Sequence, residues 1–198
     1  MHLSSRWVTA VLASAALASG LGTTAFGSPA ASPAASAEAA AKAVPVAKQR
    51  LKASSAELAK CMPKAKVNVK VELKTDAVGF DDFEISAKGL PKNTTFTVFL
   101  LEQADSPFGA AEYIGDITSD KKGRASNEFK LIVEEGFSST LVNGQRVRKE
   151  LNQVGMWFAD PAGDDFCFGK GKGAITPFDG DDEAGVQAFN SRYATPLP

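Results

Sequence analysis

Residues 66–74 alternate strictly between polar and apolar side chains, and this pattern constrains the fold more than any other feature of the chain. A period of two places every second side chain on the same face of a β-strand. One face consists of Val67, Val69, Val71 and Leu73, and the other consists of Lys66, Asn68, Lys70, Glu72 and Lys74. The segment is therefore predicted to be a strand with one face in a core and the other in solvent.

Further short strand patterns follow, separated by Gly, Pro or Asp, and no long amphipathic helix pattern occurs after residue 61. Asn143-Gly144 is the strongest signal for a two-residue hairpin turn. Residues 141–142 before this turn and residue 147 after it belong to the two strands of the predicted hairpin. The other predicted strands cover residues 83–87, 96–100, 113–117, 128–133, 154–159, 166–168 and 184–189. This spacing predicts an all-β chain that forms an antiparallel sandwich or barrel over residues 63–198.

The N-terminal residues have the features of a secretory signal peptide, which we assign to residues 1–30. A charged start at residues 1–6 precedes an uncharged apolar stretch at 7–21, and pairs of small residues at 25–27, 28–30 and 35–37 offer cleavage sites. No second apolar span follows the signal. The protein is predicted to be secreted into the extracellular space, without a stable membrane anchor.

Residues 31–62 are predicted to be a low-complexity linker. The segment is rich in Ala, Ser and Pro, a composition that buries too little apolar surface to fold. Residues 48–60 contain neither Gly nor Pro and are rich in Ala, Leu, Lys and Glu, which favours a short helix there.

The chain contains one histidine, His2, which lies within the predicted signal peptide. Cleavage would leave a mature protein without imidazole, which excludes Ser-His-Asp and Cys-His nucleophile pairs and histidine-ligated metals. We predict no catalytic residues, no cofactor and no metal site in a non-enzymatic protein.

The two cysteines, Cys61 and Cys167, are predicted to form a disulfide, because the destination is oxidising and neither thiol has another partner in the sequence. The alternative is a lipidated Cys61, since residues 58–61 superficially resemble a lipobox. Lys60 before the cysteine and the absence of an adjoining apolar run argue against lipidation.

Clustered carboxylates are the remaining candidates for catalysis, since paired acids can hydrolyse glycosides. The clusters are Asp81-Asp82, Asp164-Asp165 and residues 179–183, all in segments typical of turns, where acidic residues commonly form local hydrogen bonds. Residues 179–183 also offer oxygens at alternate positions, as a calcium loop does, with Asp160 and Asp164 as neighbouring ligands, but they lack the EF-hand pattern.

Two other motifs have both a functional and a structural interpretation. Trp157 and Phe158 are consecutive on a predicted strand and point to opposite faces, so they cannot both lie in one core unless the strand is buried on both sides. One of them can be exposed for stacking on a sugar or an apolar ligand, and the structural interpretation is one core residue beside a partly covered neighbour. The glycine- and lysine-rich residues 169–173 lack the Walker spacing of a phosphate loop and are predicted to form a flexible basic loop.

Residues 89–98 bring in a resemblance to known domains. Leu90, Thr94 and Phe96 match in type and spacing the strand-to-strand corner of fibronectin type III and related immunoglobulin-like domains. The phrases at residues 107–115 and 176–180 are similar to secreted bacterial proteins of uncharacterised function. The resemblance implies an immunoglobulin-like β-sandwich and carries no activity with it.

The function predicted from these features is that of a secreted, non-catalytic binding or structural module whose loops contact an unknown protein or a cell-envelope or carbohydrate partner. The formal net charge of −1 gives no reason to expect a nucleic-acid partner. Residues 38–74 contain nine basic and three acidic residues, which makes an anionic cell-surface polymer one such partner. The alternative is a small secreted hydrolase that uses carboxylates, such as a glycan-active enzyme.

Overall fold

The structure, a computed structural model, describes residues 43–133, 136–177 and 183–198. The predicted signal peptide and its cleavage sites lie outside the described residues, as does most of the acidic segment 179–183. A compact unit begins at Lys42 and extends to Pro198.

Strands dominate the described residues, and each helix among them is short. The strands are β1 (Val46–Ala53), β2 (Lys66–Glu72), β3 (Asp81–Lys88), β4 (Thr95–Leu101), β5 (Ala111–Thr118), β6 (Arg124–Leu131), β7 (Phe137–Val142), β8 (Gln145–Glu150), β9 (Gln153–Phe158) and β10 (Gln187–Asn190). The helices are α1 (Ala56–Cys61), α2 (Thr75–Val78), the 3₁₀ turn η1 (Pro161–Asp164) and α3 (Asp165–Phe168). The prediction of an all-β chain is thereby confirmed.

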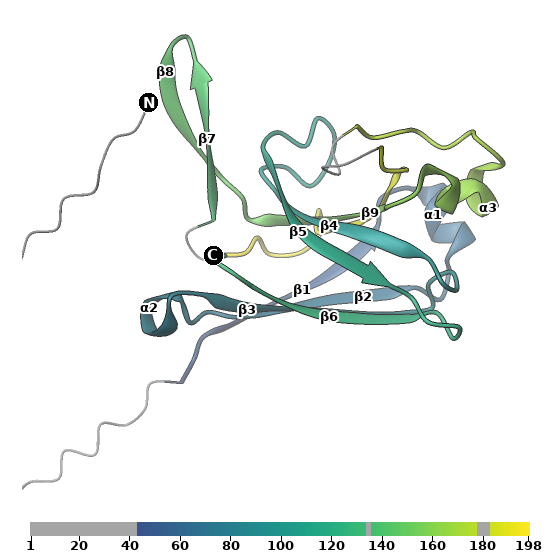
Figure 1. The fold of residues 1–198 in the computed structure, drawn as a ribbon, viewed down its shortest axis with the longest axis horizontal. Helices are drawn as coiled ribbons and strands as arrows, with labels where there is room; N and C mark the ends of the chain where they lie inside the picture. The colour runs from purple at the N-terminus through teal and green to yellow at the C-terminus, as the bar shows by residue number, and fades with distance from the viewer. Residues whose placement is uncertain (1–42, 134–135, 178–182) are drawn as a thin grey trace, which may run out of the picture. The chain divides into compact units, whose positions relative to one another are not determined.

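Eight strands form one antiparallel sheet in the order β5-β4-β9-β10-β1-β2-β3-β6. It consists of two four-stranded ladders joined where β1 pairs with β10, at Lys52–Asn190 and Ala53–Phe189. The sheet curves so far that its edge strands approach each other, and the Asn127 side-chain amide of β6 donates a hydrogen bond of 3.1 Å to the Asp116 carbonyl of β5. The result is close to a barrel, with the two ladders facing each other across a core (Figure 1).

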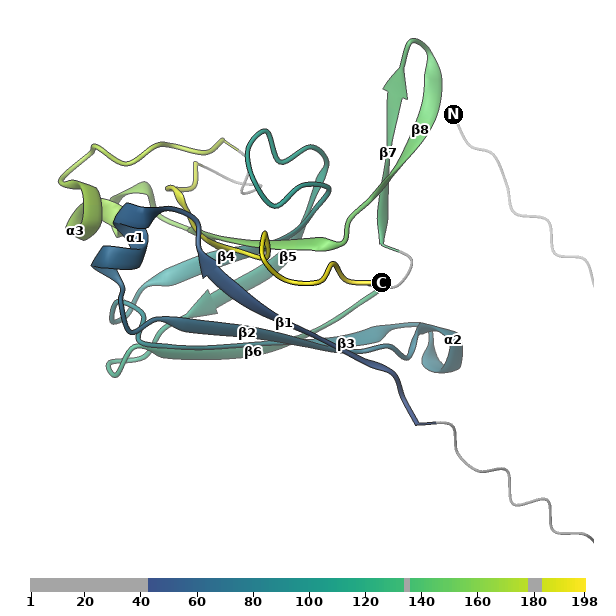
Figure 2. The same ribbon diagram turned by 180° about the vertical axis from the view of Figure 1, so that it is seen from behind.

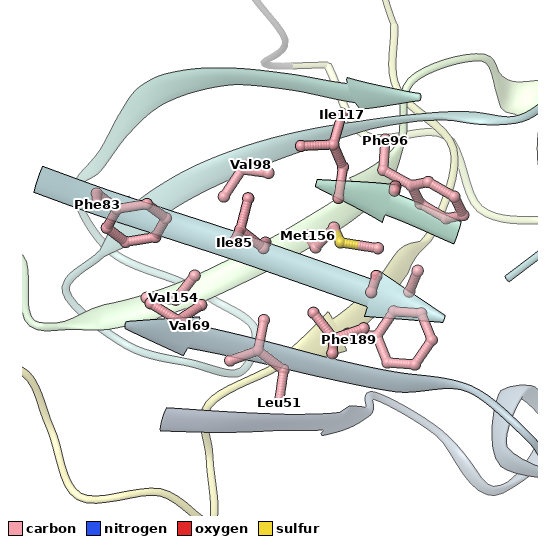
Figure 3. Close-up of a cluster of buried hydrophobic side chains, with 14 of the residues drawn as sticks. Leu51, Val69, Phe83, Ile85, Phe96, Val98, Ile117, Val154, Met156 and Phe189 are labelled. Carbon is pink, nitrogen blue, oxygen red and sulfur yellow. The ribbon is translucent and has the colours of Figure 1, made fainter. Parts of the chain in front are cut away.

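The core lies between the inner faces of the two ladders. Residues 66–72 form β2 as predicted, with the valines buried and the alternate polar side chains directed outward. Figure 3 shows apolar side chains of β2 and β3 opposite those of β4, β5 and β9. The completely or almost completely buried members include Val69, Phe83, Ile85, Phe96, Val98, Ile117, Val154 and Met156. Their burial on both ladders is the main stabilising contribution of the fold.

The strand β1 corrects the prediction that residues 31–62 are a linker with a helix over 48–60. Residues Val46–Ala53 form β1, in which residues 46–51 pair with β2, and only the later part of the predicted helix is helical, as α1. The alternation of β1 is concealed because one of its buried positions is Gln49, whose amide donates a 2.7 Å hydrogen bond to the Thr195 carbonyl. Pairing with β2 thus overrides the helix propensity of the segment.

The prediction of a strand over residues 166–168 is wrong, because these residues form the single turn α3. The turn continues η1, whose N-cap Asp160 accepts a 2.8 Å hydrogen bond from the Ala162 amide. A Phe-Cys-Phe sequence suits a strand by propensity, but α3 buries no side chain completely and Phe166 is exposed. Among the described residues, no helix is long and apolar enough to cross a membrane.

A two-stranded sheet, formed by β7 and β8, projects from the curved sheet (Figure 1). Asn143 and Gly144 have positive φ values of 52° and 78°, as a type I′ turn requires, so the predicted hairpin is confirmed. Its strands pair only with each other among the described residues, and most of its side chains are exposed.

Candidate functional site

The disulfide between Cys61 and Cys167 fixes one end of the molecule. The two residues are 106 positions apart in the sequence, and their Cα atoms lie 5.5 Å apart. The bond joins α1 to α3, which lie side by side in Figures 1 and 2. The predicted bridge is confirmed, and a bridged Cys61 has no thiol left for lipidation.

A pocket of about 570 Å³ opens beside this bridge. It lies between α1, the loop from β4 to β5, and the C-terminal strand β10. Its lining residues are Ser54, Ser55, Glu57, Leu58, Asp105, Ser106, Phe108, Phe168, Val186, Gln187 and Arg192. Apolar side chains and a few polar groups combine in it, and its volume falls within the range of small-molecule sites.

A buried amide network holds the β4–β5 loop against β10. The Asn190 amide nitrogen lies within hydrogen-bond distance of the Ala104 carbonyl at 3.2 Å, Asp105 Oδ1 at 3.0 Å and Gln187 Oε1 at 2.9 Å. The Gln187 amide donates to the same Ala104 carbonyl at 3.0 Å. Asn190 is completely buried, so these bonds give the loop a defined position behind the pocket.

Arg192 is the cationic group of the pocket. Its Nη2 lies 3.0 Å from Asp105 Oδ1 and donates a 2.9 Å hydrogen bond to the Ser54 carbonyl. It therefore connects the β4–β5 loop to the residues before α1. Its side chain remains about one-third exposed, so a ligand in the pocket can reach part of it.

The two carboxylates of the pocket have different partners. Asp105 forms the ion pair with Arg192. Glu57 lies in the first turn of α1, where backbone N–H groups, and then the Ser55 hydroxyl, lower its pKa. The lowered pKa of Glu57 is the opposite of the raised pKa that the general acid of a glycosidase needs.

Phe108 joins the pocket to the interior. Its ring lies 5.1 Å from that of Trp157 in an edge-to-face arrangement. Trp157 and Phe158 are both completely buried, because loops cover the outer face of β9 while the core covers its inner face. Neither of the two is exposed for stacking on a ligand, and their consecutive positions reflect a strand covered on both sides.

Asp81 and Asp82, one predicted carboxylate pair, have structural partners. Asp81 is completely buried and accepts hydrogen bonds from the amides of Lys74, Thr75 and Val133, at 2.6, 2.9 and 2.8 Å. Asp82 forms ion pairs with Lys74 and Lys130. Hydrogen bonds from Lys74, and then from Lys130, lower the pKa of Asp82.

Asp164 and Asp165, the second pair, differ in environment. Asp164 is completely buried; one of its oxygens accepts a 3.1 Å hydrogen bond from the Val186 amide, and Oδ1 has no hydrogen-bond partner. Burial raises the pKa of Asp164. Asp165 accepts a 2.6 Å hydrogen bond from the Gly171 amide, which orders the start of the glycine- and lysine-rich loop.

The calcium alternative falls mostly outside the described residues, because positions 179–182 do. Within the described residues, no group of three His, Cys, Asp or Glu side chains is arranged to hold a metal ion. Asp160, one of the expected neighbouring ligands, instead caps η1.

Four basic residues of the N-terminal half lie on the outer face of the ladder that contains β1 and β2. Lys48, Arg50 and Lys52 of β1 and Lys66 of β2 are exposed. They form no part of the pocket lining. The surface is thus compatible with an anionic partner at a place separate from the pocket.

The comparisons with known proteins name no relative from which the role of the site could be interpreted. No protein-family model matches the chain, and no curated protein matches it.

None of the pocket residues was a sequence-based candidate. They come from segments far apart in the chain, and the one sequence signal close to them is the cysteine pair.

Proposed function

We propose that the protein is a secreted, non-catalytic binding module with an immunoglobulin-like arrangement of two facing β-ladders. The disulfide is compatible with an oxidising extracellular destination. Leu90 and Phe96, which carry the resemblance to the fibronectin corner, are both buried in the core. The pocket beside the disulfide is the proposed ligand site, and its ligand is a component of the cell envelope, a carbohydrate or a protein.

The observation that carries this proposal is the state of the carboxylates in the pocket. Glycoside hydrolysis by a carboxylate pair needs one acid that remains protonated. Asp105 forms an ion pair with Arg192, and the pKa of Glu57 is lowered, which is the opposite of the shift that a general acid needs. Such charges, beside apolar Leu58 and Phe168, suit recognition of a ligand that has both polar and apolar groups.

One observation favours the alternative of a carboxylate-dependent hydrolase, namely the raised pKa of Asp164. That residue is completely buried and does not line the pocket. A general acid must come within hydrogen-bond reach of the bond that it protonates. We therefore place binding ahead of hydrolysis.

The test uses the exported protein, coated on a surface and exposed to soluble cell-wall fragments and a panel of glycans. Arg192→Ala removes the cation of the pocket and is expected to reduce ligand retention about tenfold or more, the loss typical of a charged hydrogen-bonding partner. Lys121→Ala is the matched control, because it removes one positive charge from the exposed turn between β5 and β6, which belongs neither to the pocket lining nor to the basic face of β1 and β2. It should leave retention unchanged.

The same samples are assayed for newly formed reducing ends. We expect none to be released during retention. Release of reducing ends by the wild-type protein would contradict the non-catalytic assignment. Retention that is equal in wild type and Arg192→Ala would remove the pocket as the binding site.

A further inference from the structure

We propose that the β7–β8 hairpin is a dimerisation arm, in which the β7 strands of two copies of this chain pair antiparallel about a two-fold axis. The proposal is independent of the ligand pocket. It rests on a difference between the two outer edges of the hairpin, of which only one is protected by charged side chains against pairing with another strand.

The outer edges of the hairpin are available for pairing. The long sheet brings its edge strands β5 and β6 close together, whereas β7 and β8 pair only with each other among the described residues. An unpaired edge presents a row of N–H and C=O groups that can add another strand. Two-stranded hairpins are also marginal alone, and further strands stabilise them.

The two edges differ in charge. β8 contains Arg146, Arg148, Lys149 and Glu150, and charged side chains of this kind are a means by which natural edge strands prevent association. β7 has the sequence Phe-Ser-Ser-Thr-Leu-Val, with no charge, proline or glycine. In each β8 strand three basic residues outnumber one acidic residue, so the approach of two β8 edges is opposed by like charge, whereas two β7 edges carry no charge that would oppose their meeting. A contact between the β7 edge of one copy and the β8 edge of the next would leave a free edge at each end of the assembly, so further copies could add without limit. Two-fold pairing of β7 uses the β7 edges of both copies, and the assembly ends at the dimer.

The register of the hairpin shows which backbone groups point outward. Val142 pairs with Gln145 across the turn, and the Leu151 amide donates a 3.0 Å hydrogen bond to the Gly136 carbonyl at the base. Hydrogen-bonded and non-hydrogen-bonded pairs alternate in an antiparallel ladder. The backbone groups of Phe137, Ser139 and Leu141 therefore face the free edge.

If Ser139 of one copy lies opposite Ser139 of the other, the apolar side chains of this edge come into contact across the two strands. This pairing places Phe137 of each copy opposite Leu141 of the other, on the same face of the combined sheet. Both are exposed in the single chain, at 49% and 66%. Aromatic–aliphatic cross-strand pairs stabilise sheets, and here the pair would occur twice.

The expected dimer is weak. A six-residue edge buries less than the roughly 1,200 Å² of a standard specific interface. Arg148, whose guanidinium lies 4.1 Å above the Phe137 ring, covers part of the apolar surface in the single chain. We therefore expect a concentration-dependent equilibrium between monomer and dimer rather than a permanent dimer.

The first experiment measures sedimentation of the exported protein over a wide concentration range. Ser139→Pro removes an N–H that faces the β7 edge, and Arg146→Pro removes one that faces the β8 edge. Each proline disturbs the same hairpin without removing a bond between β7 and β8. The wild type and Arg146→Pro should dimerise, and Ser139→Pro should weaken dimerisation about tenfold or more.

The second experiment uses Ser139→Cys and Arg146→Cys in a glutathione buffer, because the two native cysteines are already bridged. A residue on the two-fold axis lies close to its copy, so Ser139→Cys should form a covalent dimer and Arg146→Cys should remain largely monomeric. A wild type that is monomeric at every concentration would overturn the proposal, as would equal crosslinking of both variants. A monomer whose β7 edge pairs with a strand of another protein would also contradict it.

Discussion

Asp164 is the residue at which burial and charge conflict most directly. Its carboxylate is completely buried, one oxygen has no hydrogen-bond partner, and Gly173 packs so closely that an added Cβ would lie 2.1 Å from Oδ1. Burial raises the pKa of this carboxyl, so folding favours the protonated form more than the unfolded chain does. Ionisation of Asp164 therefore costs stability. The cost is absent below the ordinary pKa of Asp and complete above the raised folded-state pKa.

Asp164→Asn should accordingly raise the free energy of unfolding at neutral pH by about 1 kcal/mol, because an amide avoids the cost of a buried charge. Below about pH 3.8, the ordinary value for Asp, the substitution should bring no gain. Urea unfolding of both proteins at the two pH values measures the difference.

Asp82→Asn is a control for which the expected change in the free energy of unfolding at neutral pH has the opposite sign. Hydrogen bonds from Lys74 and Lys130 lower the pKa of Asp82, so its contribution is present at neutral pH and is lost as the pH falls through the folded-state pKa. This variant should be less stable than wild type at neutral pH and equal to it in acid. If Asp164→Asn and Asp82→Asn shared the same pH dependence, the assignment of Asp164 as a buried, destabilising charge would be wrong.

At the scale of elements, Asp81 connects three segments. Its carboxylate accepts hydrogen bonds from the first residues of α2 and from the Val133 amide after β6, while Asp81 itself begins β3. Asp81→Ala would leave three N–H groups without these acceptors, so we expect a loss of about 3 kcal/mol in the free energy of unfolding. Urea unfolding measures the loss, and hydrogen exchange of the Lys74, Thr75 and Val133 amides should accelerate.

Asp82→Ala is the neighbouring control, because its side chain makes ion pairs with lysines at the surface. The Asp82 side chain is partly buried, but its partners are lysine side chains, of which Lys130 is exposed, and its removal leaves no backbone amide without an acceptor. The loss should therefore be smaller than that of Asp81→Ala. Equal losses would show that Asp81 has no special connecting role.

Elements with an explicit period were predictable from the sequence, and elements defined by tertiary contacts were not. The alternation in residues 66–72 and the Asn143-Gly144 turn correctly predict β2 and the β7–β8 hairpin. β1 escapes prediction because Gln49 occupies a buried position that a pattern of apolar residues cannot reveal. Of the candidate site, only the disulfide was predictable, since the pocket combines segments more than 130 residues apart, such as Ser54 and Arg192.

For the molecule as a whole, β1 and β10 form the joint between the two ladders, and the pocket lies beside that joint. The Ser54 amide, directly after β1, donates a 3.1 Å hydrogen bond to the Ala188 carbonyl of β10. The disulfide then ties α1, which follows β1, to α3, which follows β9. The joint and the bridge thus hold the pocket walls from two sides.

The two helices that the disulfide joins are not equally anchored without it. Leu58 of α1 is 1% exposed, and Ser55 caps the helix by accepting a 3.2 Å hydrogen bond from the Leu58 amide. α3 has no completely buried side chain. The double variant Cys61→Ser/Cys167→Ser should therefore lose about 2–5 kcal/mol of stability. Hydrogen exchange in the folded state should accelerate mainly in α3 and at the pocket wall near Phe168, whereas α1 stays protected. Urea unfolding and amide exchange of the variant measure these effects, and equal acceleration in both helices would contradict the unequal anchoring.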